Sequence, residues 1–447
     1  MSKRLLPQLI LLSLLWCQNT SAGDEMETPA ATLPEPLSLA AALASIDDNH
    51  PRLVGAQADT ASREADAAQV AASDDTRIDL TAELHRIKPI AGPPYDSRDD
   101  SRASITLYKR LYDFGRTRHR IDAASKETAA SRATLALTRL QLRQQVMQDY
   151  FNVLLADLAA ASANEAMAVA YVRLDRARDE LELGRIPELE LLKLEDAYQQ
   201  QLLQRQRAES AQRQTRAQLA LTLNRPDELS ATLEPPQLPG LTSPLPEYED
   251  LLNDSLANNP ALQALNAQLL ALQDEQKAVR AQRYPELYLQ LEAHEYRQEY
   301  GSRTPLRGIL GINVPLYQGG RVDADISARL AKRRSLTAQK TQTEYEIRQK
   351  LLTTLQQIAT LQLQLKQATI REDYRELYLD RSRAEYELEI KTDLGDAMVE
   401  QSDARQFAEK TRFELALARE TLVVLTGNPS WSALTPPDAA AANEATQ

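Results

Sequence analysis

Cysteine, glycine and aromatic residues are scarce in this sequence. The chain has 447 residues with one cysteine, Cys17, together with 13 glycines, 22 prolines and 5% aromatic residues. A single cysteine excludes an internal disulfide framework. The low content of turn-forming residues argues against many short strands or repeated α/β units, which need more of them.

The distribution of proline indicates long helices. No proline occurs between Pro94 and Pro187, or between Pro315 and Pro429, and glycine is rare in both intervals. Proline costs roughly 3 kcal/mol inside a helix and glycine about 1 kcal/mol. Stretches that exclude both residues for sixty or more positions are predicted to be long helices, which argues against a compact Rossmann or barrel enzyme.

The first 22 residues have the pattern of a secretory signal peptide. Lys3 and Arg4 precede an apolar stretch at 9–16, and the small residues of 20–22 follow. This order predicts cleavage after residue 22. A transmembrane anchor is one alternative, but it would need about 20 apolar residues, and this stretch has fewer. Lipidation of Cys17 is a second alternative, which the bulky Trp16 disfavours.

The charge of the chain is acidic, with a formal net charge of −12. Loss of the signal peptide would remove Lys3 and Arg4 and make the mature chain more acidic still. An acidic exported protein is a poor binder of nucleic acid. No later window has 18 uninterrupted apolar residues, so we expect no second helical span. A membrane crossing would then have to use strands.

The sequence repeats itself once. Residues 111–116, Leu-Tyr-Asp-Phe-Gly-Arg, align with 316–321, Leu-Tyr-Gln-Gly-Gly-Arg, at an offset of 205, and 183–189 align with 388–394 at the same offset. Agreement in order and offset predicts a tandem repeat. The predicted segments are a signal peptide 1–22, an extension 23–36, a first repeat 37–226, a proline-rich linker 227–246, a second repeat 247–430 and a tail 431–447.

Each repeat is predicted to contain two strands and three main helices. Alternation of apolar and polar residues predicts strands at about 76–88, 101–113, 285–295 and 305–317. Heptad-like apolar spacing predicts helices that pack as coiled coils. The helices are expected at about 52–73, 116–183, 188–224, 261–283, 321–390 and 393–426.

Four amphipathic strands cannot close a barrel, because the smallest spanning barrels have eight. The strands therefore form a small soluble sheet or are pooled between subunits, and three chains would supply 12. Eight tyrosines lie in or beside the strand pairs, as in an interfacial aromatic belt, although tyrosines packing a soluble hairpin are the alternative. They are Tyr95, Tyr108, Tyr112, Tyr284, Tyr288, Tyr296, Tyr300 and Tyr317.

The strand-to-helix motifs resemble a known family. Val-Pro-Leu-Tyr-Gln-Gly-Gly-Arg at 314–321, its partner at 111–116, and Asn-His-Pro at 49–51 are similar to the outer-membrane efflux protein (TolC) family. The resemblance implies a mainly α protein with a small β part, in which long α-helical hairpins continue into four strands of a trimeric 12-stranded outer-membrane β-barrel. It also implies a homotrimer in the bacterial outer membrane, docked on a periplasmic membrane-fusion adaptor and an inner-membrane RND or ABC-type transporter.

Within this frame, three groups of residues are candidate functional residues. The apolar strand positions Leu80, Leu107, Leu289 and Leu310 are expected to face lipid, and Gly115, Gly319 and Gly320 to form the corners between strand and helix. The expected aperture and adaptor-docking tips contain Gly184, Arg185, Glu188, Glu190, Asp393 and Asp396.

The acids at the tips have two interpretations. Repeated around a trimer axis, they would form carboxylate rings that favour cations. Acids in the first turn of a helix also offset the helix dipole by about 0.3–1 kcal/mol. Capping is the favoured interpretation for Glu188 and Asp393, while both remain open for Glu190 and Asp396.

The sequence shows no catalytic constellation, metal-ligand spacing or cofactor motif, so we expect a passive exit duct of a tripartite efflux pump or type I secretion system. A periplasmic coiled-coil adaptor or structural rod is the alternative. The substrate, whether drug, metal ion or protein, the inner-membrane pump and the resting state of the aperture are not determined by the sequence.

Overall fold

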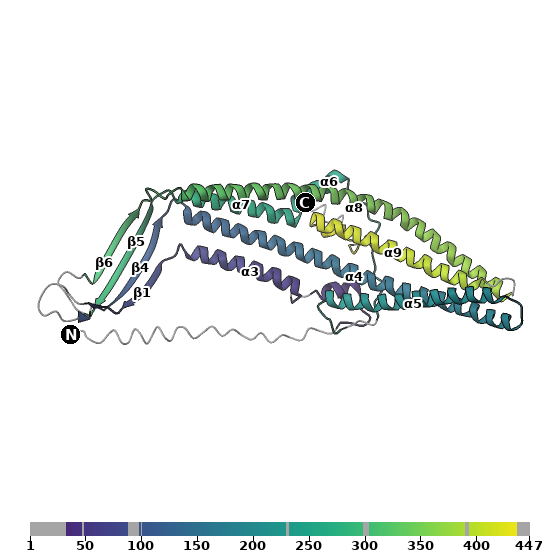
Figure 1. The fold of residues 1–447 in the computed structure, drawn as a ribbon. Helices are drawn as coiled ribbons and strands as arrows, with labels where there is room; N and C mark the ends of the chain where they lie inside the picture. Colours follow the sequence, from purple (N-terminus) through teal and green to yellow (C-terminus); the bar gives the residue numbers. More distant parts are fainter. Residues whose placement is uncertain are drawn as a thin grey trace.

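The computed structural model describes residues 33–46, 49–87, 98–99, 101–228, 232–297, 304–388 and 393–435. The predicted signal peptide, the possible lipidation of Cys17 and most of the C-terminal tail lie outside these residues. The molecule is elongated, with a small sheet at one end and long helices that extend away from it (Figure 1).

Two helices of equal length form the body of the molecule. α4 (Arg116–Glu182) and α8 (Arg321–Glu387) each have 67 residues, which is about 100 Å at 1.5 Å per residue. α5 (Glu188–Thr222) and α9 (Leu394–Thr426) run back along them. α3 (Pro51–Ala72) and α7 (Pro260–Ala281) lead to the sheet, and α2 (Leu39–Ala44) and α6 (Tyr248–Asn258) are short.

The main sheet is antiparallel and has the order β1-β4-β5-β6. It contains β1 (Arg77–Glu83), β4 (Arg102–Tyr112), β5 (Glu286–Tyr296) and β6 (Leu306–Asn313). The two repeats therefore join at the β4–β5 pair, while β1 and β6 are the edges.

Two strands are shorter than the sequence predicted. β1 ends at Glu83, and two residues later β2 (Arg86–Ile87) pairs with β3 (Arg98–Asp99) instead of extending the main sheet. β6 ends at Asn313. Pro315 follows, and proline cannot donate a hydrogen bond to a strand ladder.

The helices form a layer with the same order as the sheet. Near the sheet the contacts run α3–α4–α7–α8, and toward the other end they run α5–α4–α9–α8. α4 is central throughout, whereas α8 lies at one edge of the layer and α3 and α5 lie at the other. In the described part of the chain, both edges of the main sheet are unpaired and neither edge of the helical layer faces a further long helix, although the short α6 packs on α8 and α9.

The hydrophobic core lies where the short helices and the linker cross the long ones. Phe151 of α4 stacks on Phe413 of α9, with ring centroids 4.5 Å apart. The buried Tyr150 hydroxyl lies 2.8 Å from the carbonyl oxygen of Leu37 and 2.6 Å from that of Glu234. The first repeat, the linker and the second repeat therefore share one core.

Among the described residues, α4 is long and apolar enough by length and composition to cross a membrane, whereas the sequence predicted no second helical span. α4 contacts α3, α5, α7 and α9 along its length. These contacts bury 17% of the most apolar 18-residue window of the helix.

The corners between strand and helix require left-handed backbone. Gly115 has φ of 82°, and Gly319 and Gly320 have φ of 60° and 77°. Phe114, the counterpart of Gly319, adopts φ of 55° without being glycine. Its ring lies between Tyr112 and Tyr284, at centroid distances of 4.8 and 5.3 Å. These contacts offset the cost of a left-handed residue with a side chain.

Candidate functional site

One face of the sheet is apolar. Ile78, Leu107, Leu291 and Gly308 occupy one row across the four strands, and Leu80, Ile105, Ala293 and Leu306 occupy the next. Leu289 pairs with Leu310, so the four predicted leucines, Leu80, Leu107, Leu289 and Leu310, all lie on this face. Leu80 and Leu310 are 68% and 69% exposed. A contiguous exposed apolar face marks a contact with another protein or with a membrane.

The row of Leu289 and Leu310 also contains Lys109. The Lys109 amine donates a hydrogen bond to the carbonyl oxygen of Asp74, beside the end of α3. A long basic side chain that reaches away from an apolar surface is typical of a membrane interface. This row therefore lies nearer the helical end of the apolar face than the rows of Leu107 and Leu80.

The opposite face is polar and its charges are paired. Its carboxylates in the described strands each meet an arginine: Asp79 with Arg77 at 2.8 Å, Glu83 with Arg102 at 2.7 Å, Glu286 with Arg110 at 3.2 Å and Glu292 with Arg307 at 2.7 Å. Alternating side chains along each strand separate these residues from the leucines.

Tyr108 and Tyr288 also lie on the polar face, where Tyr108 pairs with Arg77 and Gln290, and Tyr288 with Arg110 and Gly311. The prediction that these two tyrosines belong to an interfacial belt beside the leucines is therefore wrong. They have the parity of the polar residues: each is adjacent in sequence to a leucine of the apolar face, so strand alternation already places it on the other face. Tyr112 pairs with Leu287 after a bulge and does lie on the apolar side, while Tyr95 and Tyr300 lie outside the described residues.

The corner that follows β4 contains a partly buried charge network. Glu286 binds both Arg110 and Arg116 and accepts a hydrogen bond from the Tyr108 hydroxyl at 2.9 Å. Asp113 accepts from the backbone and side chain of Thr117, at 2.8 and 2.6 Å, and so caps the first turn of α4. Gly115 was predicted from the sequence, whereas Glu286 was not, because its partners lie about 170 residues away in the chain.

The far end of the molecule brings together the tips of both helical hairpins (Figure 1). Gly184, with φ of 68°, ends α4 in a Schellman motif, in which its N–H donates to the Leu181 carbonyl and the Arg185 N–H donates to the Glu180 carbonyl, both at 2.8 Å. Pro187 is the N-cap of α5, and Glu188 and Glu190 lie in its first turn. Glu190 pairs with Lys193 at 3.3 Å.

The second tip corrects the interpretation of Asp393. Asp393 occupies the N-cap position of α9 but makes no side-chain cap hydrogen bond. Its Oδ2 instead accepts from the hydroxyl of Tyr378 on α8, at 3.0 Å. The tip is thus tied to α8 through a tyrosine, which sequence spacing gave no reason to single out.

Asp396 joins the two hairpins. Its carboxylate lies 2.5 Å from Arg173 Nη2 on α4. Nearly two turns further along α9, Ser402 donates to Glu165, and Ser162 donates to Asp403 at 2.9 Å. The α4–α9 contact between repeats is therefore partly polar near the tip, and the charge of Asp396 is compensated.

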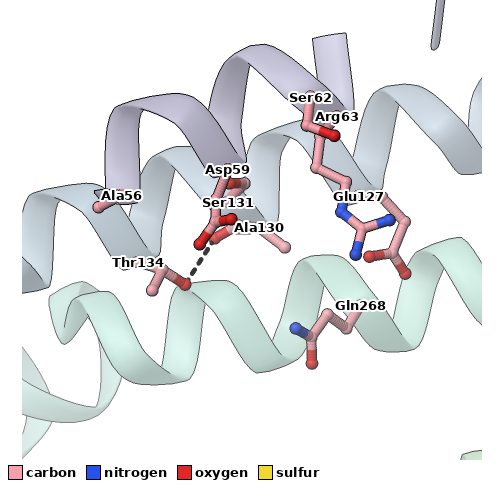
Figure 2. Close-up of a pocket in the computed structure, with 9 residues that line it drawn as sticks. All are labelled: Ala56, Asp59, Ser62, Arg63, Glu127, Ala130, Ser131, Thr134 and Gln268. Carbon is pink, nitrogen blue, oxygen red and sulfur yellow. Dashed lines mark hydrogen bonds between the residues drawn. The ribbon is translucent and has the colours of Figure 1, made fainter. Parts of the chain in front are cut away.

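A polar cavity lies between α3, α4 and α7 (Figure 2). Its volume is about 390 Å³, and it is lined by Ala56, Asp59, Ser62, Arg63, Glu127, Ala130, Ser131, Thr134 and Gln268. Burial raises the pKa of Glu127, and the Thr134 hydroxyl donates to the Ala130 carbonyl at 3.1 Å. The described residues contain no group of three side chains able to hold a metal ion.

Asp274 of α7 is a buried carboxylate with two cationic partners. It pairs with Lys126 of α4, and with Lys277 at 2.8 Å. Burial acts to raise the pKa of Asp274, but hydrogen bonds from the two lysines outweigh it and leave the pKa below the usual range. A lowered folded-state pKa stabilises the fold above the unfolded pKa, and this contribution disappears as pH falls through the folded-state pKa.

We therefore expect Asp274→Asn to reduce stability at pH 7 by about 1–3 kcal/mol and to reduce it far less at pH 3. Urea unfolding of the purified protein at both pH values measures this difference. An equal loss at both pH values would show that the carboxylate charge contributes nothing.

The comparisons with known proteins identify the family. The sequence model of the outer membrane efflux protein family matches residues 42–225 and 251–428, one match in each repeat. The chain belongs to the outer membrane efflux protein family. The resemblance of the strand-to-helix motifs to this family is thereby confirmed, and the protein is an efflux channel of the outer membrane that extends into the periplasm.

Solved structures with the same fold are also outer-membrane proteins. The chain is similar to the Campylobacter jejuni CmeC outer membrane channel, with a TM-score of 0.72 and 15% identity over 91% of this chain and 88% of that one. It is similar to the outer membrane protein VceC of Vibrio cholerae, with a TM-score of 0.70 and 18% identity over 87% of this chain and 96% of that one. It is also similar to the open state of the Neisseria gonorrhoeae MtrE outer membrane channel, with a TM-score of 0.69 and 17% identity over 89% of this chain and 90% of that one.

No curated protein matches the chain significantly in sequence. At these low identities the structural neighbours establish the fold: a mainly helical chain of two repeats with a small β part. The family and its solved relatives are channel proteins, which favours a duct over an enzyme.

Proposed function

We propose that three copies of this chain form a passive exit duct that conducts solutes from a periplasmic adaptor and an inner-membrane transporter to the cell exterior. The observation that carries the proposal is the sheet, which has one apolar face and two open edges, β1 and β6. Open edges are not tolerated in lipid. Edge pairing of β6 with β1 of the next copy would satisfy both.

The helical layer has matching unsatisfied edges. On α8, Leu363, Ile370 and Leu377 are spaced by seven residues and are 68–71% exposed. On α5, at the opposite edge, Leu189, Leu192 and Leu203 are exposed. A heptad seam of this kind requires a partner helix. Contact of α8 with α5 of the next copy buries both seams and generates a ring by repeated rotation.

Three copies are the number that the resemblance implies, giving a barrel of 12 strands, since a single chain with four falls short of the eight that the smallest barrels have. Outer-membrane lipid would contact the apolar face. The adaptor would dock at the tips around Gly184, Arg185, Glu188 and Glu190, and an RND or ABC-type transporter would supply the energy. Residues 1–22 would direct export and be cleaved.

A periplasmic adaptor or rod is the competing function. Such a protein has no need of a sheet with one exposed leucine-rich face, whereas a duct needs one in the membrane. The sheet therefore favours the duct. Whether the duct serves an efflux pump or type I secretion depends on the transporter, and the genes adjacent to this one would distinguish the two.

The decisive test is assembly and conduction. We expect the full chain, expressed with its N-terminal segment, to fractionate with the outer membrane, to migrate as a heat-resistant trimer and to form ion channels in planar bilayers. Native mass spectrometry of the detergent-purified protein gives the copy number. A monomer in the soluble periplasmic fraction would overturn the proposal.

The acids of the second tip provide a separate test of an aperture. Asp393 and Asp396 would recur three times around the axis, although Tyr378 and Arg173 already bind them. We expect Asp393→Asn with Asp396→Asn to lower the cation-to-anion permeability ratio at least about twofold, because carboxylate rings favour cations. The reversal potential in a salt gradient measures this ratio. An unchanged ratio would mean that the acids only tie the hairpins together.

A further inference from the structure

Tyr108 and Tyr288 form a continuous aromatic strip on the polar face, near the helical end of the sheet. Their ring centroids are 5.7 Å apart and their planes differ by 24°. The Tyr108 hydroxyl is held by Glu286, and Arg77 Cζ lies 6.0 Å from the Tyr108 ring centroid. The two rings belong to the central strands β4 and β5, while Arg77 lies on β1 and the Tyr288 ring reaches over Gly311 of β6.

Gly311 makes room for Tyr288. A Cβ at Gly311 would lie 2.7 Å from Tyr288 Cε1 and closer still to Cζ and the hydroxyl oxygen. Real Cβ atoms do not approach other atoms so closely, so the ring occupies the space that a side chain on β6 would need. Tyr288 can therefore lie over β6 instead of projecting away from the sheet.

The surroundings of the strip are electrically balanced. The four carboxylates of the polar face are paired with arginines in the described strands, so this face offers a passing solute little net charge. The faces of tyrosine rings carry negative electrostatic potential and attract cations and other aromatic groups. Arg77 beside Tyr108 already shows this contact within the chain.

We propose that Tyr108 and Tyr288 are a solute-contact strip for aromatic organic cations on the inner wall of the duct, and that Gly311 keeps Tyr288 in that wall. The inference rests on the proposed function, because the polar face lines a lumen only when copies close into a barrel. In a trimer the strip would recur three times around the bore, and a solute in transit would pass it.

Ethidium, an aromatic cation, is the probe for the contact. In planar bilayers we expect Tyr288→Leu to raise the half-blocking ethidium concentration about threefold or more, which corresponds to loss of one exposed cation–π contact. Tyr317→Leu, at the strand-to-helix corner after β6, where the side chain is 90% exposed, is the matched control and should leave the block unchanged. Equal block in wild-type and Tyr288→Leu channels would overturn the contact strip.

Gly311→Ala tests the placement of Tyr288. We expect the added methyl group to push the ring into the bore and to lower KCl conductance, and Gly311→Ala with Tyr288→Ala to restore it. Gly308→Ala is the control on the other face of the same strand, where a Cβ meets Leu291 Cδ2 at an ordinary 3.4 Å. Wild-type conductance in an assembled Gly311→Ala trimer would contradict the proposed position of the Tyr288 ring over Gly311.

The two levels of inference can fail separately. If wild-type trimers form no channels, the proposed duct is wrong and the strip loses its lumen. If wild-type trimers conduct but neither ethidium block nor conductance responds to these variants, the strip alone is wrong.

Discussion

Leu107→Arg is expected to prevent insertion of the protein into the outer membrane. Leu107 lies in the row of Ile78, Leu291 and Gly308, at the centre of the apolar face. An arginine at the midplane of a membrane barrel costs about 2–4 kcal/mol, and three copies would multiply this cost around the ring. The yield of heat-resistant trimer in outer-membrane fractions measures the effect.

Two further variants make the result specific to position. Leu310→Arg shares a row with Lys109, so it should cost only about 0–1 kcal/mol, as near an interface. Thr106→Arg, next to Leu107 but on the polar face beside Asp79 and Glu292, should insert normally. Normal trimer yield for Leu107→Arg would show that the apolar face does not contact lipid.

Arg143→Met is expected to destabilise the folded subunit by about 3 kcal/mol, because breaking a buried ion pair leaves an uncompensated charge. Glu420 of α9 has a side chain only 1% exposed, and Arg143 Nε of α4 lies 2.7 Å from its Oε1. Ser432 donates to the other carboxylate oxygen at 2.8 Å and would remain. Urea unfolding of the detergent-purified protein gives the loss.

The same helix supplies the control. Arg132 of α4 pairs with Glu64 at 2.7 Å, but their side chains are 66% and 47% exposed. Arg132→Met should therefore cost less than about 1 kcal/mol. In the double variant Arg143→Met with Glu420→Gln, much of the lost stability should return, since no buried charge remains unpaired. Equal losses for Arg143→Met and Arg132→Met would contradict a special role for the Glu420 pair.

Local patterns predicted the elements of this fold well. The scarcity of proline and glycine indicated α4 and α8, because each of these residues destabilises a helix at its own position. Period-two alternation indicated the leucine face for the same local reason. The strand ends were less predictable. Alternation continues beyond Glu83 and Asn313, but their pairing partners are the first residues of β4 and β5, so the hydrogen-bonded pairing ends there.

The side-chain partners at the tips and corners could not be predicted. Asp393 has the sequence context of a cap, yet Tyr378 binds it, and Arg173 of the first repeat binds Asp396 of the second. Each outcome depends on which element lies beside which, and this information is not local in the chain.

The sequence by itself determined that this protein is a tandem repeat with long helices, four amphipathic strands and glycine corners. Periodicity and helix-breaking residues are local signals, and the repeat is visible by aligning the chain with itself. Only the tertiary structure decided that β4 and β5 join the repeats, that Glu286 binds Arg110 and Arg116, and that the Tyr288 ring fills the space above Gly311. Strand order and register bring residues together across some 180 positions of chain. Packing, and no local pattern, fixes such contacts.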